Sequence, residues 1–306
     1  MNKLLVICGP TATGKTNLGV YLAKRFNGQL ISADSRQVFK DLDIGTGKDK
    51  NLVGNIYGYD LVEAKDRFSL GQYLKLANKK ITEIQKQGKL PIVVGGTGLY
   101  IKGLIDGIPT ALIARNEDLR KTLSEKTPGK LFDILAQFDP TKAASLNQSD
   151  RSNPRRLVRA IEIAQARQTG LSVKKLKKRM NVCQVGLTTN LSFFEKRIKE
   201  RIQARIVAGI EAEICDLFTM GVTWNDQAMT SLGYKEWQGF FAGKKNLEEV
   251  LSDWQKGEMQ YVKRQLVWFK KDKRINWFDI SDPLYRKNVE NLVKKWYPRG
   301  TNAKEN

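Results

Sequence analysis

The sequence predicts an α/β protein with a mainly parallel sheet. In the first 110 residues, short and continuous apolar runs alternate with longer stretches of helical periodicity. A run without polar alternation is typical of a strand that is covered on both faces, as in a parallel sheet. The 306 residues, 41% of them apolar, are enough for one or two domains with a buried core.

The predicted elements follow one another along most of the chain. Pro154 is well placed to open a helix that ends near Gly170. Apolar residues recur every four positions from Phe194 to Ile214, which predicts one long amphipathic helix. The predicted strands cover 3–8, 29–33, 59–62, 91–95, 181–188 and 275–280, and the other predicted helices cover 16–26, 69–87 and 254–271.

The strand pattern is interrupted between residues 111 and 180, where the sequence becomes helical and polar. We therefore predict a core domain formed by 1–110 together with 181–290, with its C-terminal helices packed back on the sheet. The interruption at 111–180 is predicted to be a helical insertion domain. Residues 291–306 are predicted to form a flexible tail.

Composition excludes several kinds of chemistry. The chain has no histidine, which rules out a Ser-His-Asp triad, a histidine-ligated zinc ion and an imidazole base. Cys8, Cys183 and Cys215 lie far apart and in no C-x-x-C pair, which predicts free thiols in the reducing cytoplasm. No stretch of 18 apolar residues occurs, so we expect no membrane segment.

A phosphate-binding motif directly follows the first predicted strand. It satisfies the pattern G-x-x-x-x-G-K-[ST] with Gly9, Pro10, Thr11, Ala12, Thr13, Gly14, Lys15 and Thr16. In such a loop, backbone N–H groups at a helix N-terminus surround phosphate oxygens, the lysine adds charge, and the last hydroxyl can hold Mg²⁺. The motif therefore predicts a P-loop NTPase-like core that binds a diphosphate or a nucleotide such as ATP.

A candidate acid ends the second predicted strand. Leu30-Ile31-Ser32-Ala33 leads into Asp34, which is either the acid that holds Mg²⁺ in a nucleotide hydrolase or a general base. Its structural alternative is a helix or turn cap. The polar run Ser35-Arg36-Gln37 follows at a strand end, where ligands of open α/β sheets bind. A second turn, Gly95–Gly98 with Thr97, by itself also fits a tight strand-to-helix connection.

The charge distribution favours a nucleic-acid partner. The chain carries a net charge of +21, and residues 151–209 contain 15 Lys or Arg against 3 Glu. Part of this excess is the run at 174–179. A solvated helix face is the usual explanation for such a run, but the one-sided balance favours contact with phosphates.

Six motifs, in this order, resemble those of the tRNA dimethylallyltransferase family. The resemblance covers about residues 4–280. The motifs are Gly9–Thr16, Ser32-Ala-Asp-Ser-Arg-Gln37, Asp43-Ile-Gly-Thr46 with Lys48, Val94-Gly-Gly-Thr-Gly-Leu-Tyr100, Arg156-Leu-Val-Arg-Ala-Ile-Glu162 and Tyr261-Val-Lys-Arg-Gln-Leu-Val-Trp-Phe269.

The resemblance implies a reaction. A dimethylallyl group would pass from dimethylallyl diphosphate to N6 of the adenosine directly 3′ of the anticodon, position 37 of tRNA. It implies that Asp34 is the base, that Thr97 contacts the reacting region, that Arg264 faces the diphosphate, and that Thr16 holds Mg²⁺. We expect a cytoplasmic monomer.

The resemblance also implies a set of tRNA contacts with the anticodon stem-loop. The target base would have to leave the loop's stack to be modified. The implied contacts are Asp34, Ser35, Arg36, Gln37, Thr97, Arg120, Arg155, Arg156, Leu157, Val158 and Arg159.

Two departures from the family pattern qualify these expectations. Leu191 stands where the family usually has an active-site arginine, so either Arg264 or Lys196 substitutes or the rate is reduced. Asp49 stands where the family usually has proline after Lys48.

Two other functions share some of these features. A P-loop small-molecule kinase has the same loop and sheet, and its phosphate-binding arginines would resemble the basic insertion. A non-catalytic tRNA-binding homologue would keep the basic surface, and Leu191 is the best support for it.

Overall fold

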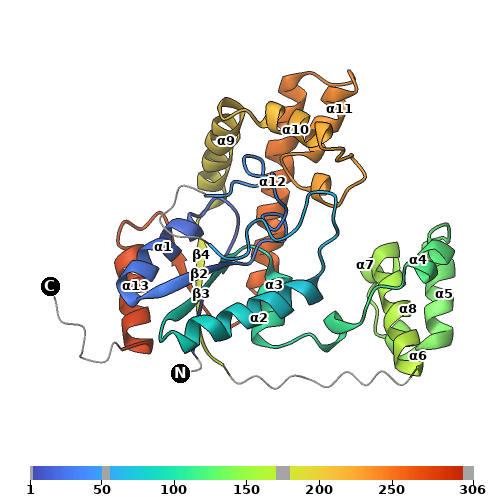
Figure 1. Ribbon diagram of the computed structural model, residues 1–306, viewed down its shortest axis with the longest axis horizontal. Helices are drawn as coiled ribbons and strands as arrows, with labels where there is room; N and C mark the ends of the chain where they lie inside the picture. Colours follow the sequence, from blue (N-terminus) through green and yellow to red (C-terminus); the bar gives the residue numbers. More distant parts are fainter. Residues whose placement is uncertain (1–2, 50–55, 170–179, 299–306) are drawn as a thin grey trace. The chain divides into compact units, whose positions relative to one another are not determined.

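The computed structural model describes residues 3–49, 56–169 and 180–298 (Figure 1). The chain divides into two compact units. The first comprises Met1–Asp106 and Lys178–Asn306, and the second comprises Gly107–Lys177. The predicted insertion, 111–180, lies mostly within the second unit.

The first unit contains a five-stranded sheet in its described part, with the strand order β2-β3-β1-β4-β5. All four pairings are parallel. The predicted α/β class and parallel sheet are therefore confirmed, and the carboxyl ends of the strands share one edge. The strands are β1 (Lys3–Cys8), β2 (Gly28–Ser32), β3 (Leu90–Gly95), β4 (Asn181–Thr188) and β5 (Ile275–Asp279).

The strand predicted at 59–62 is wrong. This segment makes only isolated bridges, one between Phe39 and Val62 and one between Tyr57 and Tyr59. Gly58 and Asp60 have positive φ angles of 106° and 53°, which turn the chain away from an extended course. A regular ladder therefore cannot continue there.

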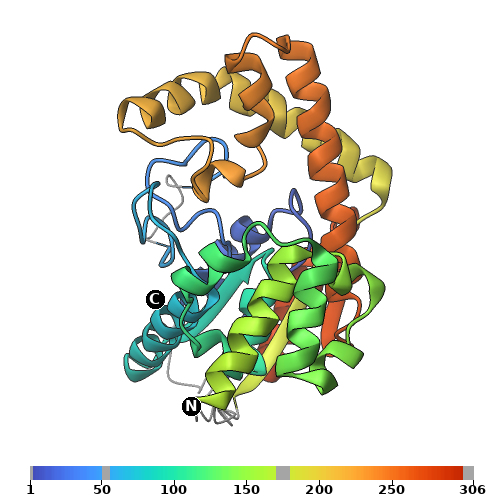
Figure 2. The ribbon, with the colours of Figure 1, turned by 90° about the vertical axis from the view of Figure 1, so that its right-hand side faces the viewer.

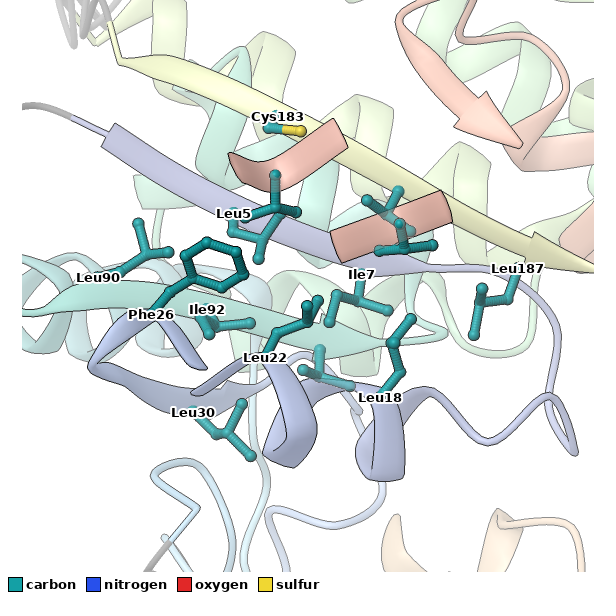
Figure 3. Packing of buried hydrophobic residues seen from close by; sticks show 14 of the residues in the cluster. Leu5, Ile7, Leu18, Leu22, Phe26, Leu30, Leu90, Ile92, Cys183 and Leu187 are labelled. Atoms are coloured by element: carbon teal, nitrogen blue, oxygen red, sulfur yellow. The ribbon is translucent and has the colours of Figure 1, made fainter. Parts of the chain in front are cut away.

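Helices cover both faces of the sheet. The α1 helix shares a buried cluster with alternate strand residues, as Figure 3 shows for Leu5, Ile7, Leu18, Leu22, Phe26 and Ile92. The helices of the first unit are α1 (Lys15–Phe26), α2 (Leu70–Lys86), α3 (Gly98–Ile105), α9 (Leu191–Val207), α10 (Ile210–Thr219), α11 (Gln238–Phe241), α12 (Leu247–Phe269) and α13 (Tyr285–Trp296), with short 3-10 turns at Ala228–Thr230 and Lys235–Trp237.

Two further predictions for the first unit need correction. The expected long helix through Ile214 is broken into α9 and α10, because Gly209 has a φ of +90° and opens a new helix. The flexible tail predicted for 291–306 is wrong for residues 291–296, which are helical. There α13 continues, since Val289 and Val293 are buried in the same cluster as α1. Residues 299–306 lie outside the described part of the chain.

The second unit is helical and has its own apolar core. Leu131, Leu135, Leu157 and Ile161 are fully buried in it. Its longest helix begins at Pro154, with the Asn153 side chain accepting a hydrogen bond at the cap. Its elements are a 3-10 turn at Pro109–Leu112, α4 (Glu117–Leu123), α5 (Pro128–Phe138), α6 (Pro140–Ala144), α7 (Gln148–Arg151) and α8 (Pro154–Gln168).

Across residues 3–49, 56–169 and 180–298, no helix is both long enough and apolar enough to cross a membrane. The three cysteines are free thiols, with Cys8 and Cys183 buried and Cys215 exposed.

Candidate active site

The phosphate-binding loop connects the end of β1 to the start of α1. Gly9 has a φ of +131°, and a Cβ there would lie 2.3 Å from the carbonyl oxygen of Leu187. Only glycine fits that close approach. Gly14, with a φ of +76°, caps α1. Inside the loop, the Thr13 hydroxyl and the Lys15 ammonium donate to the carbonyl of Pro10 at 2.9 and 2.5 Å. The loop therefore has the conformation that the motif predicts, with a helix N-terminus behind it.

Positive charge is concentrated at this loop. Burial, and then the neighbouring charge of Arg201, lower the pKa of Lys15 to about 8. A buried lysine with a lowered pKa gains its proton more readily when an anion binds beside it. The loop is thus electrostatically matched to a polyanion.

An arginine that the sequence did not single out reaches the loop from α9. One terminal nitrogen of Arg201 donates to the Thr11 hydroxyl at 2.7 Å and to the two carboxylate oxygens of Glu258 at 3.0 and 3.1 Å. One helical turn later, Arg205 donates to the same carboxylate at 3.3 Å. The Nε atom of Arg201 is buried without a hydrogen-bond partner among the described residues. Arg201 therefore keeps donor capacity at the phosphate loop.

Glu258 holds this arginine pair in place. It lies on α12, which packs against α9 (Figure 2). Burial would raise the pKa of Glu258, but the charges of Arg201 and Arg205 bring it below its ordinary value. The glutamate is therefore ionised, and two arginines against one carboxylate leave net positive charge beside the loop.

A glutamine on α12 ties the phosphate loop to the second glycine-rich turn. The Gln265 side chain accepts from the Thr11 N–H at 2.9 Å and donates to the Gly96 carbonyl at 3.0 Å. A Cβ at position 96 would lie 2.3 Å from the side-chain amide nitrogen of Gln265, so any residue other than glycine would clash there. Arg264, the neighbouring residue, is exposed instead, with its guanidinium 5.7 Å from the Tyr261 ring centre. Successive helix residues point about 100° apart, so Gln265 and Arg264 point in different directions.

The candidate base and the candidate hydroxyl come together at the ends of β2 and β3. Asp34 follows β2, and its carboxylate accepts the Arg36 N–H at 2.8 Å. The Thr97 hydroxyl accepts the Ser35 N–H at 3.0 Å and donates to the Ser35 hydroxyl at 3.4 Å. Burial raises the pKa of Tyr261 far above its ordinary value, so its hydroxyl stays protonated. Tyr261 is a further polar neighbour of this turn that sequence reasoning missed.

Comparison with known proteins shows the family of this chain. The family described as IPP transferase matches residues 37–272, and the family described as isopentenyl transferase matches residues 2–55. A tRNA dimethylallyltransferase of Pediococcus pentosaceus is 38% identical over 97% of both chains, and one of Anoxybacillus flavithermus is 35% identical over 95% of both. The chain belongs to the IPP transferase family.

Solved structures agree with this family. The tRNA isopentenylpyrophosphate transferase of Bacillus halodurans superposes with a TM-score of 0.72, at 32% identity over 97% of both chains. A eukaryotic dimethylallyltransferase described as acting on tRNA shares the fold, with a TM-score of 0.78 and 23% identity, and the match covers 96% of this chain and 78% of that one. The P-loop NTPase-like fold predicted for this IPP transferase is therefore confirmed.

Two of the predicted tRNA contacts in the first unit hold loops of the protein. Gln37 accepts from the Ser32 hydroxyl at 3.0 Å and donates to the Gly47 carbonyl at 3.2 Å. Arg36 donates to the Gln227 carbonyl at 2.8 Å. These bonds keep the segment after Asp34 in a defined course, and they use part of the hydrogen-bonding capacity that the sequence assigned to RNA.

In the second unit, two of the predicted tRNA-contacting arginines bind a buried glutamate. Arg120 donates to Glu162 through two nitrogens at 2.6 and 2.8 Å, and Arg159 donates to it at 3.0 Å. Arg159 also donates to the carbonyls of Thr110 and Ile113 at 2.7 and 3.0 Å. Burial would raise the pKa of Glu162, but these arginine hydrogen bonds hold it below its ordinary value.

The other predicted contacts of this unit differ in their surroundings. Leu157 is fully buried in the apolar core, and Val158 is half-buried against it. Arg156 is paired with Asp150. Arg155 is exposed and has no hydrogen bond or ion pair to any residue that the structure describes. The basic run at 174–179 lies outside the described residues.

Leu191 is the first residue of α9 and is 48% exposed. At 1.5 Å per residue, it is about 15 Å along the helix from Arg201. Lys196 is exposed. The residue of α9 that reaches the phosphate loop is thus an arginine, whatever residue occupies the first position of the helix.

Proposed function

We propose that this IPP transferase moves a dimethylallyl group from dimethylallyl diphosphate to N6 of adenosine 37, directly 3′ of the anticodon in tRNA. One juxtaposition carries the proposal: a cationic phosphate loop and an Asp34–Thr97 turn stand at the carboxyl ends of neighbouring parallel strands. The relatives named as tRNA dimethylallyltransferases support the same reaction.

The donor side of the site holds the leaving group. Backbone N–H groups of the loop at the α1 N-terminus face the diphosphate, and Lys15 and Arg201 supply positive charge. As the bond between the prenyl carbon and the diphosphate oxygen breaks, negative charge grows on that oxygen. Preorganised cations and N–H donors stabilise it without reorganisation.

The residues at the loop fit a Mg²⁺ ion. Thr16 lies in the first turn of α1, with the Asp49 carboxylate nearby. Mg²⁺ is usually held by one or two carboxylates together with substrate phosphates and water. The described residues contain no group of three or more His, Cys, Asp or Glu that could hold a metal ion. When bound, Mg²⁺ would offset charge on the diphosphate.

The acceptor side takes up a proton. Attack by N6 forms the nitrogen–carbon bond while the carbon–oxygen bond to the diphosphate breaks, and the amine then loses one proton. Asp34 is the carboxylate placed to accept it. Two hydrogen bonds with Ser35 hold the Thr97 hydroxyl at this turn.

We place the enzyme in the cytoplasm as a monomer that binds the anticodon stem-loop. The free thiols among the described residues fit a reducing compartment.

The test is direct. Purified protein is incubated with unmodified tRNA, Mg²⁺ and dimethylallyl diphosphate, and the nucleosides of the digested tRNA are analysed by mass spectrometry. We expect N6-(dimethylallyl)adenosine at position 37 alone. Transfer of label from γ-labelled ATP to a small molecule would instead show a kinase, and tight tRNA binding without product would show a non-catalytic homologue.

A further inference from the structure

A groove of about 650 Å³ lies between α11 and the middle of α12 in the first unit. Its walls come from residues 235–245, which include α11, and from residues 253–260 of α12, against which α11 packs (Figure 1). None of the residues that line it belongs to the phosphate loop or to the Asp34–Thr97 turn. The groove is therefore a feature separate from the candidate active site.

The charged side chains of this groove are mostly lysines, and we call it the lysine groove. They are Lys235, Lys244, Lys245, Lys256, Glu236 and Asp253. All four lysines are exposed. Glu236, by contrast, is 9% exposed, accepts the Gly233 N–H at 2.9 Å and lies 3.6 Å from the Lys235 ammonium. The exposed charge of the groove is therefore mainly positive.

Ion pairs use only part of this positive charge. Asp253 binds the Lys245 ammonium at 2.6 Å and lies 3.9 Å from that of Lys256. The Lys244 side chain has no hydrogen bond or ion pair with any residue that the structure describes. Four lysines against two carboxylates leave a net positive charge, and Lys244 keeps its donors for an anion.

The charge of α12 changes sign at the lysine groove. Residues 247–253 contain three acids and no Lys or Arg, whereas residues 259–271 contain four Lys or Arg and no acid. Glu258, between these two stretches, is buried and paired with arginines of α9. Beyond the groove, the exposed charge of α12 is therefore positive.

This positive charge extends along α12 towards the phosphate loop. Lys256, Gln260 and Lys263 are all exposed, and their spacing of four and three residues places them on one face of the helix. Gln265, which contacts the phosphate loop, follows Lys256 by about 14 Å along the helix. An anionic chain in the groove thus has a continuous basic surface on its way to the site.

We infer that the lysine groove binds the sugar–phosphate backbone of tRNA, outside the site where the base is modified. The inference rests on the proposed function, because it takes tRNA as the acceptor. Lysine contacts to phosphates supply affinity and position a nucleic acid without reading its sequence. An extended polyanion fits better than a small free anion, because it can reach several exposed lysines while staying clear of the buried Glu236 carboxylate. The relatives are named for their action on tRNA, which favours RNA over an acidic protein as the occupant.

The test measures how tRNA binding depends on salt. Unmodified tRNA is titrated with the full-length protein at a series of salt concentrations, and the affinity is determined by fluorescence anisotropy. Lys244→Ala with Lys256→Ala should weaken binding and lower the slope of log affinity against log salt by about 1.4 to 1.8, the change for two lost phosphate contacts. Changing the same two lysines to arginine keeps both charges and should keep the slope. The matched control is Lys294→Ala with Lys295→Ala, at two exposed lysines of α13, and it should leave the slope unchanged.

Two results would overturn the inference. One is a slope for the alanine variant of the groove that equals that of the unchanged protein, with thermal unfolding showing that both are folded; this would favour an acidic protein as the occupant instead. The other is an equal fall in the groove variant and the α13 variant, which would show a general effect of net charge. A protein that gives the expected slopes but transfers no dimethylallyl group would contradict the proposed function alone, whereas no tRNA binding at all would contradict both.

Discussion

Two buried glutamates, one in each unit, bind a pair of arginines and use them differently. Glu258 of the first unit binds Arg201 and Arg205, and Glu162 of the second unit binds Arg120 and Arg159. Both carboxylates are 3% exposed, and the arginines hold the pKa of both below the ordinary value against the effect of burial.

The two arginine pairs differ in the groups that accept their other N–H donors. In the second unit, Arg159 donates to two backbone carbonyls of the segment that opens the unit, so its charge and its hydrogen bonds serve the fold. In the first unit, Arg201 donates to the phosphate-loop hydroxyl of Thr11 and keeps a buried N–H without a partner among the described residues. Arg159 therefore bonds only to groups within its own unit, whereas Arg201 contacts the phosphate loop, where we propose that the diphosphate binds.

The largest expected effect is on the proposed general base, Asp34, which lies in the first unit. Asp34→Ala should lower prenyl transfer by about 10²–10⁴-fold, the usual contribution of a general base. Single-turnover transfer to tRNA measures it, with diphosphate affinity by calorimetry as the control that should stay unchanged. A variant that keeps more than half of the rate would remove Asp34 from the mechanism.

The next effect tests the two arginine pairs against each other. Arg201→Ala should lower kcat/KM for the prenyl donor by about 10²-fold, since it removes a preorganised donor from the leaving group. Arg120→Ala, the matched change at the other glutamate, should leave donor kinetics within twofold. Equal losses in both variants would mean that Arg201 acts only through folding, and the comparison would then be broken.

A smaller effect separates free from committed arginines inside the second unit. Arg155→Ala should weaken tRNA binding and lower the slope of log affinity against log salt by about 0.9, the change for one lost phosphate contact. Arg159→Ala should reduce thermal stability instead, with a salt slope close to that of the unchanged protein. If Arg159→Ala flattened the slope and Arg155→Ala did not, our assignment of the two would be reversed.

The lowered pKa of Lys15 predicts that the protein takes up protons when a diphosphate binds at the loop. At pH 8.5 a Lys15 with a pKa of about 8 is mostly neutral, and a bound diphosphate favours its charged form. Binding should therefore take up about half a proton or more at pH 8.5 and almost none from Lys15 at pH 6.5, where it is already charged. Calorimetry in buffers of different ionisation enthalpy measures this uptake. Lys15→Met corrects for protons that the diphosphate itself releases, and an identical uptake in that variant would contradict the assignment.

The smallest effect is an expected absence of change. Leu191→Arg should alter kcat by less than twofold, because Arg201 of the same helix already brings a cation to the loop at Thr11. Steady-state transfer assays measure it. A gain of tenfold or more would show that the site lacks a cation, and it would restore the sequence-based expectation that Leu191 weakens this enzyme.

Local patterns in the sequence predict much of the fold and part of the candidate site. Continuous apolar runs predicted β1 and β3, which are buried along almost their whole length. The glycine and lysine spacing predicted the phosphate loop because its conformation depends on positive φ angles within eight residues. The false strand at 59–62 has the same apolar character, but Gly58 and Asp60 turn it away from the sheet.

Only the tertiary structure decided which charged and polar side chains meet. The packing of α9 on α12 sets Arg201 and Glu258 at Thr11, and the rotation of α12 about its axis directs Gln265 to the loop. The fold likewise directs Arg120 and Arg159 to Glu162. Hydrophobic periodicity determines which face of an element is buried. Hydrogen-bonded pairs between distant elements depend on how those elements are rotated and offset against each other, and no local pattern in the chain records that.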